Sequence, residues 1–189
     1  MSKQYLDVIY EYFAAGTEML SNISPTEVAK LVRAIESVRL AGAVVYVAGN
    51  GGSASTASHF ATDIGVGSLR RANPVKVVSL CDNAAVMTAL ANDIDFDAVF
   101  EQQIKLLGKA DDLLIVISAS GNSQNLIKAV EQAQELNMKV FSLTGFDGGA
   151  LKKLTPGSNV HVPSRIGAYG LVEDAHLAIC HVITECVRS

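Results

Sequence analysis

Apolar residues follow two kinds of pattern along the chain, and together they predict alternating strands and helices. Five short runs are rich in apolar and β-branched residues, at 43–48, 75–80, 113–118, 140–144 and 159–162. Three of these runs are almost continuously apolar, which is typical of strands covered on both faces. Apolar residues at helical spacing surround them, at 5–20, 25–40, 53–64, 84–90, 97–107, 123–136 and 171–187. This order predicts an α/β fold, a three-layer α-β-α sandwich around a five-stranded parallel sheet.

Two helices are predicted ahead of the first strand. The second begins at Ser24-Pro25-Thr26-Glu27, which has the pattern of a capping box with Pro at the first helical position. It is expected to stop near Gly42. No linker, repeat or low-complexity segment follows, so residues 1–189 are predicted to form one domain. Residues 1–41 supply its N-terminal helices, and residues 42–189 supply its α/β core.

Composition adds an expectation about assembly. The chain has 189 residues, of which 49% are apolar and 18% are charged. Its mean hydropathy is +0.29. So little charge suggests that part of the surface is hidden in an oligomer, and the two apolar N-terminal helices are suited to packing against other copies. The alternative is an ordinary monomer with a large core.

Charge and cysteine content exclude several classes of protein. The formal net charge is −4, and Lys and Arg form no run beyond the pair Arg70–Arg71. Nucleic acid binding by phosphate neutralisation is therefore not expected. The N-terminal apolar stretch contains acids, so we expect no signal peptide, and no run reaches the roughly 18 apolar residues of a membrane span. Cys81, Cys180 and Cys186 are an odd number without metal spacing, which favours buried thiols in the cytoplasm.

The loops after the strands are the candidates for chemistry, because ligands of parallel sheets bind beyond the carboxyl ends of the strands. The first loop, 49–55, reads Gly-Asn-Gly-Gly-Ser-Ala-Ser and opens a helix. Its glycines let the backbone approach a ligand, and the helix start offers N–H groups to an anion. Its spacing fits neither a dinucleotide fingerprint nor a Walker loop. A tight turn without a ligand is the alternative.

The second loop, 118–123, reads Ser-Ala-Ser-Gly-Asn-Ser and also opens a helix. Three hydroxyls beside the N–H groups of a helix start make a neutral cradle for a phosphate. Ser123 could instead be a plain N-cap. A cap needs one hydroxyl, however, and this loop offers three around a glycine, which favours phosphate binding.

The two loops also belong to a wider resemblance that covers nearly the whole chain in collinear order. The matching stretches are GNGGSASTASHFATD (49–63), ALANDIDFDAVFEQQ (89–103), ISASGNSQNLIKAVEQA (117–133), LTGFDGG (143–149) and EDAHLAICH (173–181). The sequence resembles sugar isomerase (SIS) domain proteins, and among them the phosphoheptose isomerases, which act on sedoheptulose 7-phosphate. The resemblance implies a flavodoxin-like or Rossmann-like sheet and an aldose–ketose isomerase of bacterial heptose synthesis, for lipopolysaccharide or capsule. It also implies a homotetramer with its sites at subunit contacts.

The resemblance carries over residue by residue to the substrate site. The implied substrate-binding positions are Asn50, Gly51, Gly52, Ser53, Asn92, Asp93, Ser118, Ala119, Ser120, Ser123 and Glu173. The family usually has threonine where this chain has Ala119, so one hydroxyl contact is missing. The segment 164–170 also departs from the usual family pattern, which leaves the identity of the sugar open.

The resemblance further implies a zinc site and the acid–base pair. The metal ligands would be His59, Asp63, Glu173 and His181, with Asp63 as the base and His181 as the acid. His59 and Asp63 share one helical face, and Glu173 and His181 lie about 80° apart around theirs. The family has Glu and Gln where this chain has Asp63 and Glu173. Imidazole and carboxylate groups still suit zinc.

The other two histidines are expected to be structural. His176 points about 140° away from His181 around the last helix, so it is expected to be packed or at a subunit contact. Asp174 points only about 20° from His181, and geometry alone does not exclude it from the site. His161 lies in a predicted strand.

Three other functions remain open from the sequence. One is a non-catalytic relative that binds the replication initiator, although such a protein lacks the histidine of the last helix. Another is a sugar-phosphate sensor, although sensors usually carry a DNA-binding domain. The third is an isomerase of a different sugar phosphate, which the changes at Asp63, Ala119 and Glu173 favour.

Overall fold

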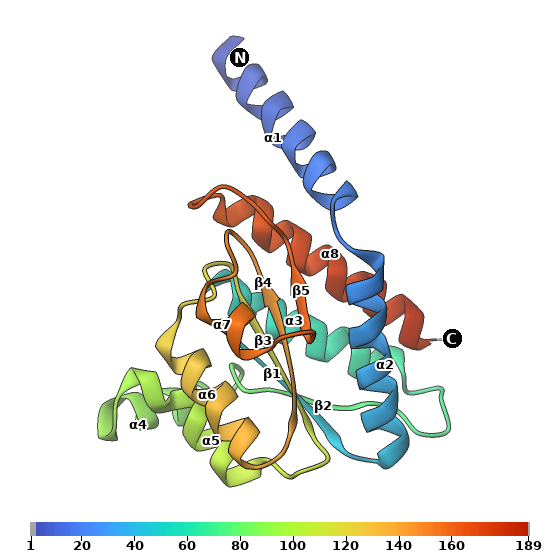
Figure 1. The fold of residues 1–189 in the computed structure, drawn as a ribbon, viewed down its shortest axis with the longest axis vertical. Helices are drawn as coiled ribbons and strands as arrows, with labels where there is room; N and C mark the ends of the chain where they lie inside the picture. Colours follow the sequence, from blue (N-terminus) through green and yellow to red (C-terminus); the bar gives the residue numbers. More distant parts are fainter. Residues whose placement is uncertain (1–2, 189) are drawn as a thin grey trace.

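One five-stranded sheet lies between two layers of helices in this computed structural model, which describes residues 3–188 (Figure 1). All neighbouring strands pair in parallel, in the order β2-β1-β3-β4-β5. The strands are β1 (Val44–Gly49), β2 (Lys76–Ser79), β3 (Leu113–Ser118), β4 (Lys139–Thr144) and β5 (Asn159–His161). The predicted fold class is confirmed, and every strand begins and ends within one residue of its predicted run.

Each predicted helical segment corresponds to a helix, and one further helix was not predicted. The helices are α1 (Lys3–Ser21), α2 (Pro25–Ala41), α3 (Gly52–Gly67), α4 (Ala84–Asp93), the 3-10 turn η1 (Phe96–Ala98), α5 (Val99–Leu107), α6 (Gln124–Glu135), α7 (Gly149–Leu154) and α8 (Tyr169–Arg188). The unpredicted helix is α7, whose six residues are too few to show a helical period and whose N-cap and first residue are both glycine. The predicted helix 97–107 is divided into η1 and α5.

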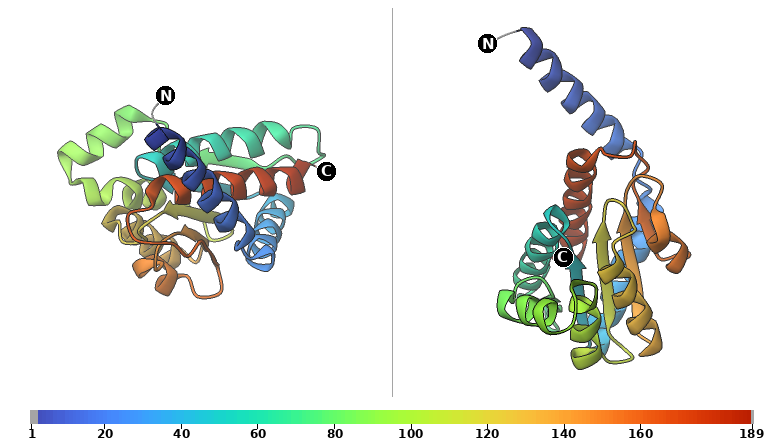
Figure 2. Two further views of the ribbon diagram at one scale, coloured as in Figure 1. Left: turned by 90° about the horizontal axis from the view of Figure 1, so that it is seen from above. Right: turned by 90° about the vertical axis from the view of Figure 1, so that its left-hand side faces the viewer.

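The central strand β3 shows why its run is continuously apolar. Leu113, Ile115 and Ile117 pack with α2, α3 and α8 on one face of the sheet. Leu114 and Val116 pack with α5 and α6 on the other face. Since both faces are covered, every position of the strand is buried and alternation with polar residues disappears. Figure 2 shows the two helical layers on either side of the sheet.

Helix α2 begins and ends as the sequence indicates, with one difference. The Ser24 hydroxyl accepts from the backbone N–H of Glu27 at 3.3 Å, and Pro25 is the first helical residue. Gly42 ends the helix in the left-handed conformation, with φ at +71°. The Glu27 carboxylate does not complete the capping box at Ser24, because it accepts from the backbone N–H of His161 in β5 at 3.3 Å. Glu27 therefore joins α2 to β5, the edge strand of the sheet.

The strand order creates a crevice between β1 and β3. These strands are adjacent, with Gly49 opposite Ile117 at their carboxyl ends. From there the chain leaves β1 toward the β2 side of the sheet and leaves β3 toward the β4 side. The two outgoing loops diverge, and such a switch point is where parallel sheets of this order bind ligands.

Helices α1 and α4 are poorly covered by the rest of the chain. Helix α1 projects from the body, and Tyr5, Tyr10 and Phe13 on it are 63%, 70% and 68% exposed (Figures 1 and 2). Helix α4 has no buried residue, although its sequence, AAVMTALAND, is mostly apolar. Among residues 3–188, no helix has both the length and the apolar character needed to cross a membrane.

A half-buried ion-pair network joins α2 to the segment before β2 and to the end of α8. The Glu36 carboxylate accepts from Arg39 at 2.7 Å and from Arg71 at 2.8 Å. Arg39 is 7% exposed and also donates to the Asn73 carbonyl, while Arg71 donates to the Val187 carbonyl in α8. The hydrogen bond from Arg39 holds the pKa of Glu36 below its ordinary value of 4.5, and the positive charges of Arg39 and Arg71 lower it further.

We predict that Glu36→Gln lowers the free energy of unfolding by about 2 kcal/mol at pH 7, because Arg39 keeps a buried charge without its partner. A carboxyl whose pKa is depressed in the folded state stabilises above its unfolded pKa and stops doing so as the pH falls through the folded value. The difference between the two proteins should therefore shrink below pH 4.5, as urea titrations at several pH values would measure.

The matched control is Glu185→Gln. Glu185 pairs with Arg188 at the same 2.7 Å, but the two side chains are 71% and 56% exposed. Loss of this pair should change stability by less than about 0.5 kcal/mol. Equal effects of the two substitutions would contradict the assignment of a structural role to Glu36.

Candidate functional site

The crevice at the switch point gathers residues of two loops and of helix α8 around a cavity of about 160 Å³. Asn50 and Ser53 come from the loop after β1, and the serine-rich turn after β3 forms the opposite wall. Two residues of α8, Tyr169 and Glu173, close the third side. The full lining is Asn50, Ser53, Ile117, Ser118, Ala119, Ser120, Ser123, Tyr169 and Glu173. Most of the predicted substrate-binding residues therefore meet here.

The serine hydroxyls of the turn are held so that their protons remain available to a ligand. Ser118 Oγ accepts from the backbone N–H of Gly121 at 3.0 Å, and Ser120 Oγ accepts from that of Asn122 at 3.3 Å. Each hydroxyl still has a proton to donate. Ser123 occupies the N-cap position of α6 but makes no side-chain cap bond, so it does not act as a plain cap. The first N–H groups of α6 add the positive end of a helix.

The loop after β4 and the start of α7 together fix the shape of the serine turn 118–123. The backbone N–H groups of Gly145 and Leu151 donate to the carbonyls of Ala119 and Gly121, at 3.1 and 2.9 Å. Gly121 has φ at +65°, and a Cβ there would overlap the carbonyl oxygen of Gly148. Glycine at 121 is therefore required both by the backbone conformation and by the close approach of the two loops.

The glycine-rich loop after β1 starts α3 beneath the crevice. Gly51 stands at the N-cap position with φ at +54°, and the N–H groups of the first turn have no intrahelical partner. Gly52 lies against the carboxylate of Glu173, so a Cβ at Gly52 would displace that carboxylate. The Asn50 side chain faces Asn125 of α6 at 2.9 Å.

Glu173 lies in the crevice and apart from the other predicted metal ligands. Eight residues separate it from His181, which corresponds to about 12 Å along a helix axis. Among the described residues, the groups that could jointly hold an ion are His59, Asp63 and His181, without Glu173.

The structure brings the other three predicted ligands together on the facing sides of α3 and α8. His59 Nε2 lies 3.1 Å from Asp63 Oδ2 and 3.1 Å from His181 Nε2, and His181 Nε2 lies 3.7 Å from Asp63 Oδ2. Bonds of 2.0–2.1 Å to a tetrahedral zinc ion would separate its ligand atoms by about 3.3 Å. Two imidazoles and a carboxylate at this spacing therefore fit zinc, and their partial exposure leaves room for a further ligand.

The remaining acidic and imidazole groups of α8 and β5 do not join this cluster. His176 is fully buried, and within residues 3–188 neither of its ring nitrogens has a hydrogen-bond partner. Burial lowers its pKa to about 4, so the ring is neutral. His161 Nδ1 contacts Thr144 Oγ1 at 3.1 Å. Asp174 accepts from the Tyr12 hydroxyl at 2.6 Å and so anchors α1 to α8.

Asn92 and Asp93 are predicted substrate residues that the chain does not bring to its own crevice. They end α4, both are exposed, and Asn92 Nδ2 donates to Asp93 Oδ1 at 2.8 Å. Neither residue lines the crevice. Tyr169, by contrast, was not predicted from the sequence although it does line the crevice. Its ring packs edge-on against that of Phe146, with 5.0 Å between the ring centroids. This contact joins residues far apart in the sequence, so no local sequence pattern indicates it.

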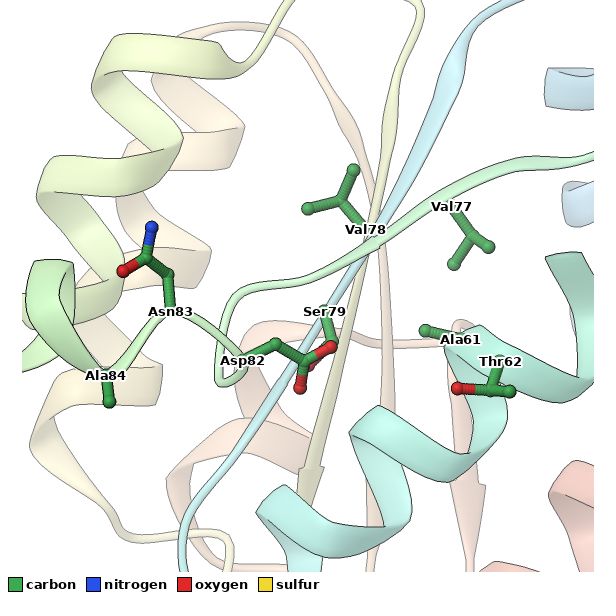
Figure 3. Close-up of a pocket in the computed structure, with 8 residues that line it drawn as sticks. All are labelled: Ala61, Thr62, Val77, Val78, Ser79, Asp82, Asn83 and Ala84. Carbon is green, nitrogen blue, oxygen red and sulfur yellow. The ribbon is translucent and has the colours of Figure 1, made fainter.

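A wider, open hollow of about 590 Å³ lies elsewhere, between α3, β2 and the turn before α4 (Figure 3). Asp82 points from that turn toward Ser79, which donates to it at 3.0 Å, and Ser58 also donates to it. No predicted site residue lines this hollow, and its carboxylate is satisfied within the chain. The crevice remains the better candidate site.

Comparisons with known proteins identify a family model and several relatives. Residues 11–145 match the family model described as the SIS domain. The chain is 39% identical over 155 residues to a phosphoheptose isomerase of Helicobacter pylori (strain P12), covering 82% of this chain and 78% of that protein. It is 32% identical over 174 residues to a phosphoheptose isomerase of Laribacter hongkongensis, covering 92% and 88%.

Solved structures are similar over the whole length. A phosphoheptose isomerase from Francisella tularensis superposes with a TM-score of 0.91 at 32% identity, covering 100% of this chain and 99% of that one. The enzyme from Neisseria gonorrhoeae superposes with a TM-score of 0.88 at 29% identity, covering 97% and 98%.

We predict that Gly121→Ala abolishes binding of inorganic phosphate, because a Cβ there must push the serine turn away from Gly148. Gly157→Ala is the matched control, since Gly157 also has a positive φ, of +76°, but its Cβ would enter open space. The control should lose only about 1 kcal/mol of stability through backbone strain. Calorimetric titration with phosphate and thermal unfolding of both variants would measure this. Normal phosphate affinity in folded Gly121→Ala protein would rule out the serine turn as the anion site.

Proposed function

The chain belongs to the SIS domain family, and we propose that it is a phosphoheptose isomerase that interconverts sedoheptulose 7-phosphate and an aldoheptose 7-phosphate. The observation that carries this proposal is the pairing of two sites along α3 and α8. At one end lies the hydroxyl-lined crevice, and further along lie the imidazole and carboxylate groups of the cluster His59, Asp63 and His181.

The separation of the two sites suits a seven-carbon substrate. Helices α3 and α8 run side by side in the same direction, since Gly52 lies against Glu173 and Gly67 lies near Thr184. From Gly52 to His59, and from Glu173 to His181, the helices rise by about 10–12 Å. An extended heptose phosphate spans such a distance, and a triose phosphate is too short. With the phosphoryl group in the serine turn, the carbonyl end reaches toward the cluster.

The reaction needs a base and an acid at adjacent atoms of the sugar. Asp63 is the proposed base, which takes the proton from the carbon beside the carbonyl through a carboxylate oxygen and leaves an enediolate. His181 is the proposed acid, which supplies a proton to the carbonyl oxygen. Asp63 would then return its proton to the former carbonyl carbon, while His181 takes a proton from the hydroxyl of the neighbouring carbon, which completes the interconversion. The hydrogen bond from His59 to Asp63 orients the carboxylate, at 3.1 Å. Binding of the distant phosphoryl group holds the reacting carbons in place.

The donor set supports zinc as the cofactor, held by His59, Asp63 and His181. When bound, zinc would polarise the carbonyl and stabilise negative charge on the substrate oxygens. Glu173 remains a proposed further ligand, but the helical rise of about 12 Å between it and His181 means that it would act on the cluster of another copy. Within its own chain it faces the substrate crevice.

A homotetramer accounts for the two uncovered helices. Helix α1, whose large apolar side chains are exposed, and helix α4, in which no residue is buried, lie at different places on the molecule (Figure 1). Two distinct surfaces that each pair with their own kind around a two-fold axis produce a tetramer, whereas one produces a dimer. Asn92 and Asp93 at the end of α4 would then serve the crevice of a neighbouring copy. A cavity of about 160 Å³ accommodates a phosphoryl group but not a whole heptose, so a neighbour would supply the missing wall.

The proposed place of action is the cytoplasm, where the product would enter the synthesis of heptose units for lipopolysaccharide or capsule.

We predict that His181→Ala abolishes turnover of sedoheptulose 7-phosphate and lowers bound zinc, because it removes the acid and one of three ligands. Product analysis and metal measurement on the purified protein would test both. His161→Ala, which removes an imidazole from β5 instead, should keep zinc and activity. Full activity of His181→Ala would remove this residue from the mechanism. If the protein turns over a different phosphorylated sugar and not sedoheptulose 7-phosphate, the proposed substrate is wrong but the proposed reaction class stands.

A second prediction concerns shared sites. Chains carrying Asp93→Ala and chains carrying His181→Ala should each be inactive, yet mixed tetramers should recover about a quarter of the sites if the two residues come from different copies. Co-expression followed by assay and light scattering would measure this. Inactive mixed tetramers would place both residues in one chain's site, and a monomer in solution would contradict the proposed assembly.

A further inference from the structure

The crevice between β1 and β3 is spanned by a pair of amides, and the proposed function assigns no role to one of them, Asn125. Asn50 Nδ2 donates to Asn125 Oδ1 at 2.9 Å, and Asn125 Nδ2 donates to Asn50 Oδ1 at 2.9 Å. Asn50 belongs to the glycine-rich loop after β1, and Asn125 is the second residue of α6, just beyond the serine turn. The pair therefore joins the two loops that diverge at the switch point.

The amide pair can fix the distance between the loop after β1 and the start of α6. Asn125 is only 1% exposed, whereas Asn50 is half-buried and also lines the crevice. Two reciprocal hydrogen bonds define both the separation and the orientation of the amide planes, and a buried amide that lost its partner would be costly. The sheet itself does not set this separation, because strand pairing ends at Gly49 and Ile117.

We propose that Asn125 is a positioning residue that sets the width of the crevice by holding Asn50. The serine turn binds the phosphoryl group from the β3 side, and α3, which follows the Asn50 loop, carries His59 and Asp63 on the β1 side. The distance between the phosphoryl group and the reacting carbons is thereby fixed by the amide pair. The inference rests on the proposed function for its substrate, but the width of the crevice can be tested by binding alone.

Two substitutions break the pair in different ways. Asn125→Asp keeps the shape of the side chain, but its carboxylate cannot donate to Asn50 Oδ1 and repels it. Asn125→Leu keeps the branched shape of the side chain, with a larger volume, and removes both hydrogen bonds. Glu131→Gln is the control, because Glu131 is exposed on the same helix and lies outside the crevice.

The readout compares two ligands, inorganic phosphate and sedoheptulose 7-phosphate. Both Asn125 variants should bind inorganic phosphate within about twofold of the unsubstituted protein, because the serine turn is intact. They should turn over the sugar phosphate at least about tenfold more slowly, with the loss mainly in kcat, since misplacement of the reacting end by about 1 Å is enough. A purely structural role would lower the melting temperature without this split between the ligands.

The outcomes separate this inference from the proposed function. Equal losses for both ligands, or unchanged turnover in folded Asn125→Asp protein, would overturn the positioning role. If the unsubstituted protein binds the sugar phosphate without turning it over, the proposed function fails. The role of Asn125 is then decided by the ratio of the two affinities, because a misplaced reacting end also weakens binding of the sugar phosphate while binding of inorganic phosphate stays unchanged. If both Asn125 variants fail to fold, Asn50→Asp breaks the same pair from its more exposed side and is judged by the same ratio.

Discussion

The parallel order β2-β1-β3-β4-β5 is the constraint on which the site depends. It makes the chain leave β1 and β3 in opposite directions, so that two loops part at the middle of the sheet and leave a crevice. Each loop also opens a helix, α3 or α6, whose first N–H groups have no partner within the helix. A place for an anion therefore follows from topology before any side chain is considered, and the side chains then decide which anion fits.

The crevice that we propose as the phosphate site has no positive side chain among the described residues that line it. One of these residues, Glu173, is an acid. Attraction must then come from hydroxyl donors and from the start of α6. Such a site depends on geometry more than on charge, which explains the bracing of the serine turn by Gly145 and Leu151. It also explains how a protein with a net charge of −4 can hold a phosphorylated ligand.

The crevice and the His59, Asp63 and His181 cluster lie at different positions along helices α3 and α8. Their glycines at 52 and 67 lie against Glu173, Thr184 and Arg188, so the two helices pack closely at both ends. This packing brings His59 and Asp63 to His181 across a sequence separation of more than a hundred residues. The same packing keeps Glu173 at the crevice, because position on a helix fixes position along its axis. A ligand set that looks like one group in the sequence is thus separated into two places in each chain.

The sequence by itself determined the sheet, most helices and the residue types of the site. Runs such as 113–118 are apolar because both faces of a parallel sheet are covered, and the Ser24 cap is a local pattern that neighbouring residues enforce. Only the tertiary structure decided which groups meet. In the folded chain Glu27 contacts β5, and Asn50 pairs with Asn125. Tyr169 lines the crevice, and Glu173 lies apart from His181. Those contacts join residues far apart in the chain, and periodicity and spacing report only on neighbours within a few residues.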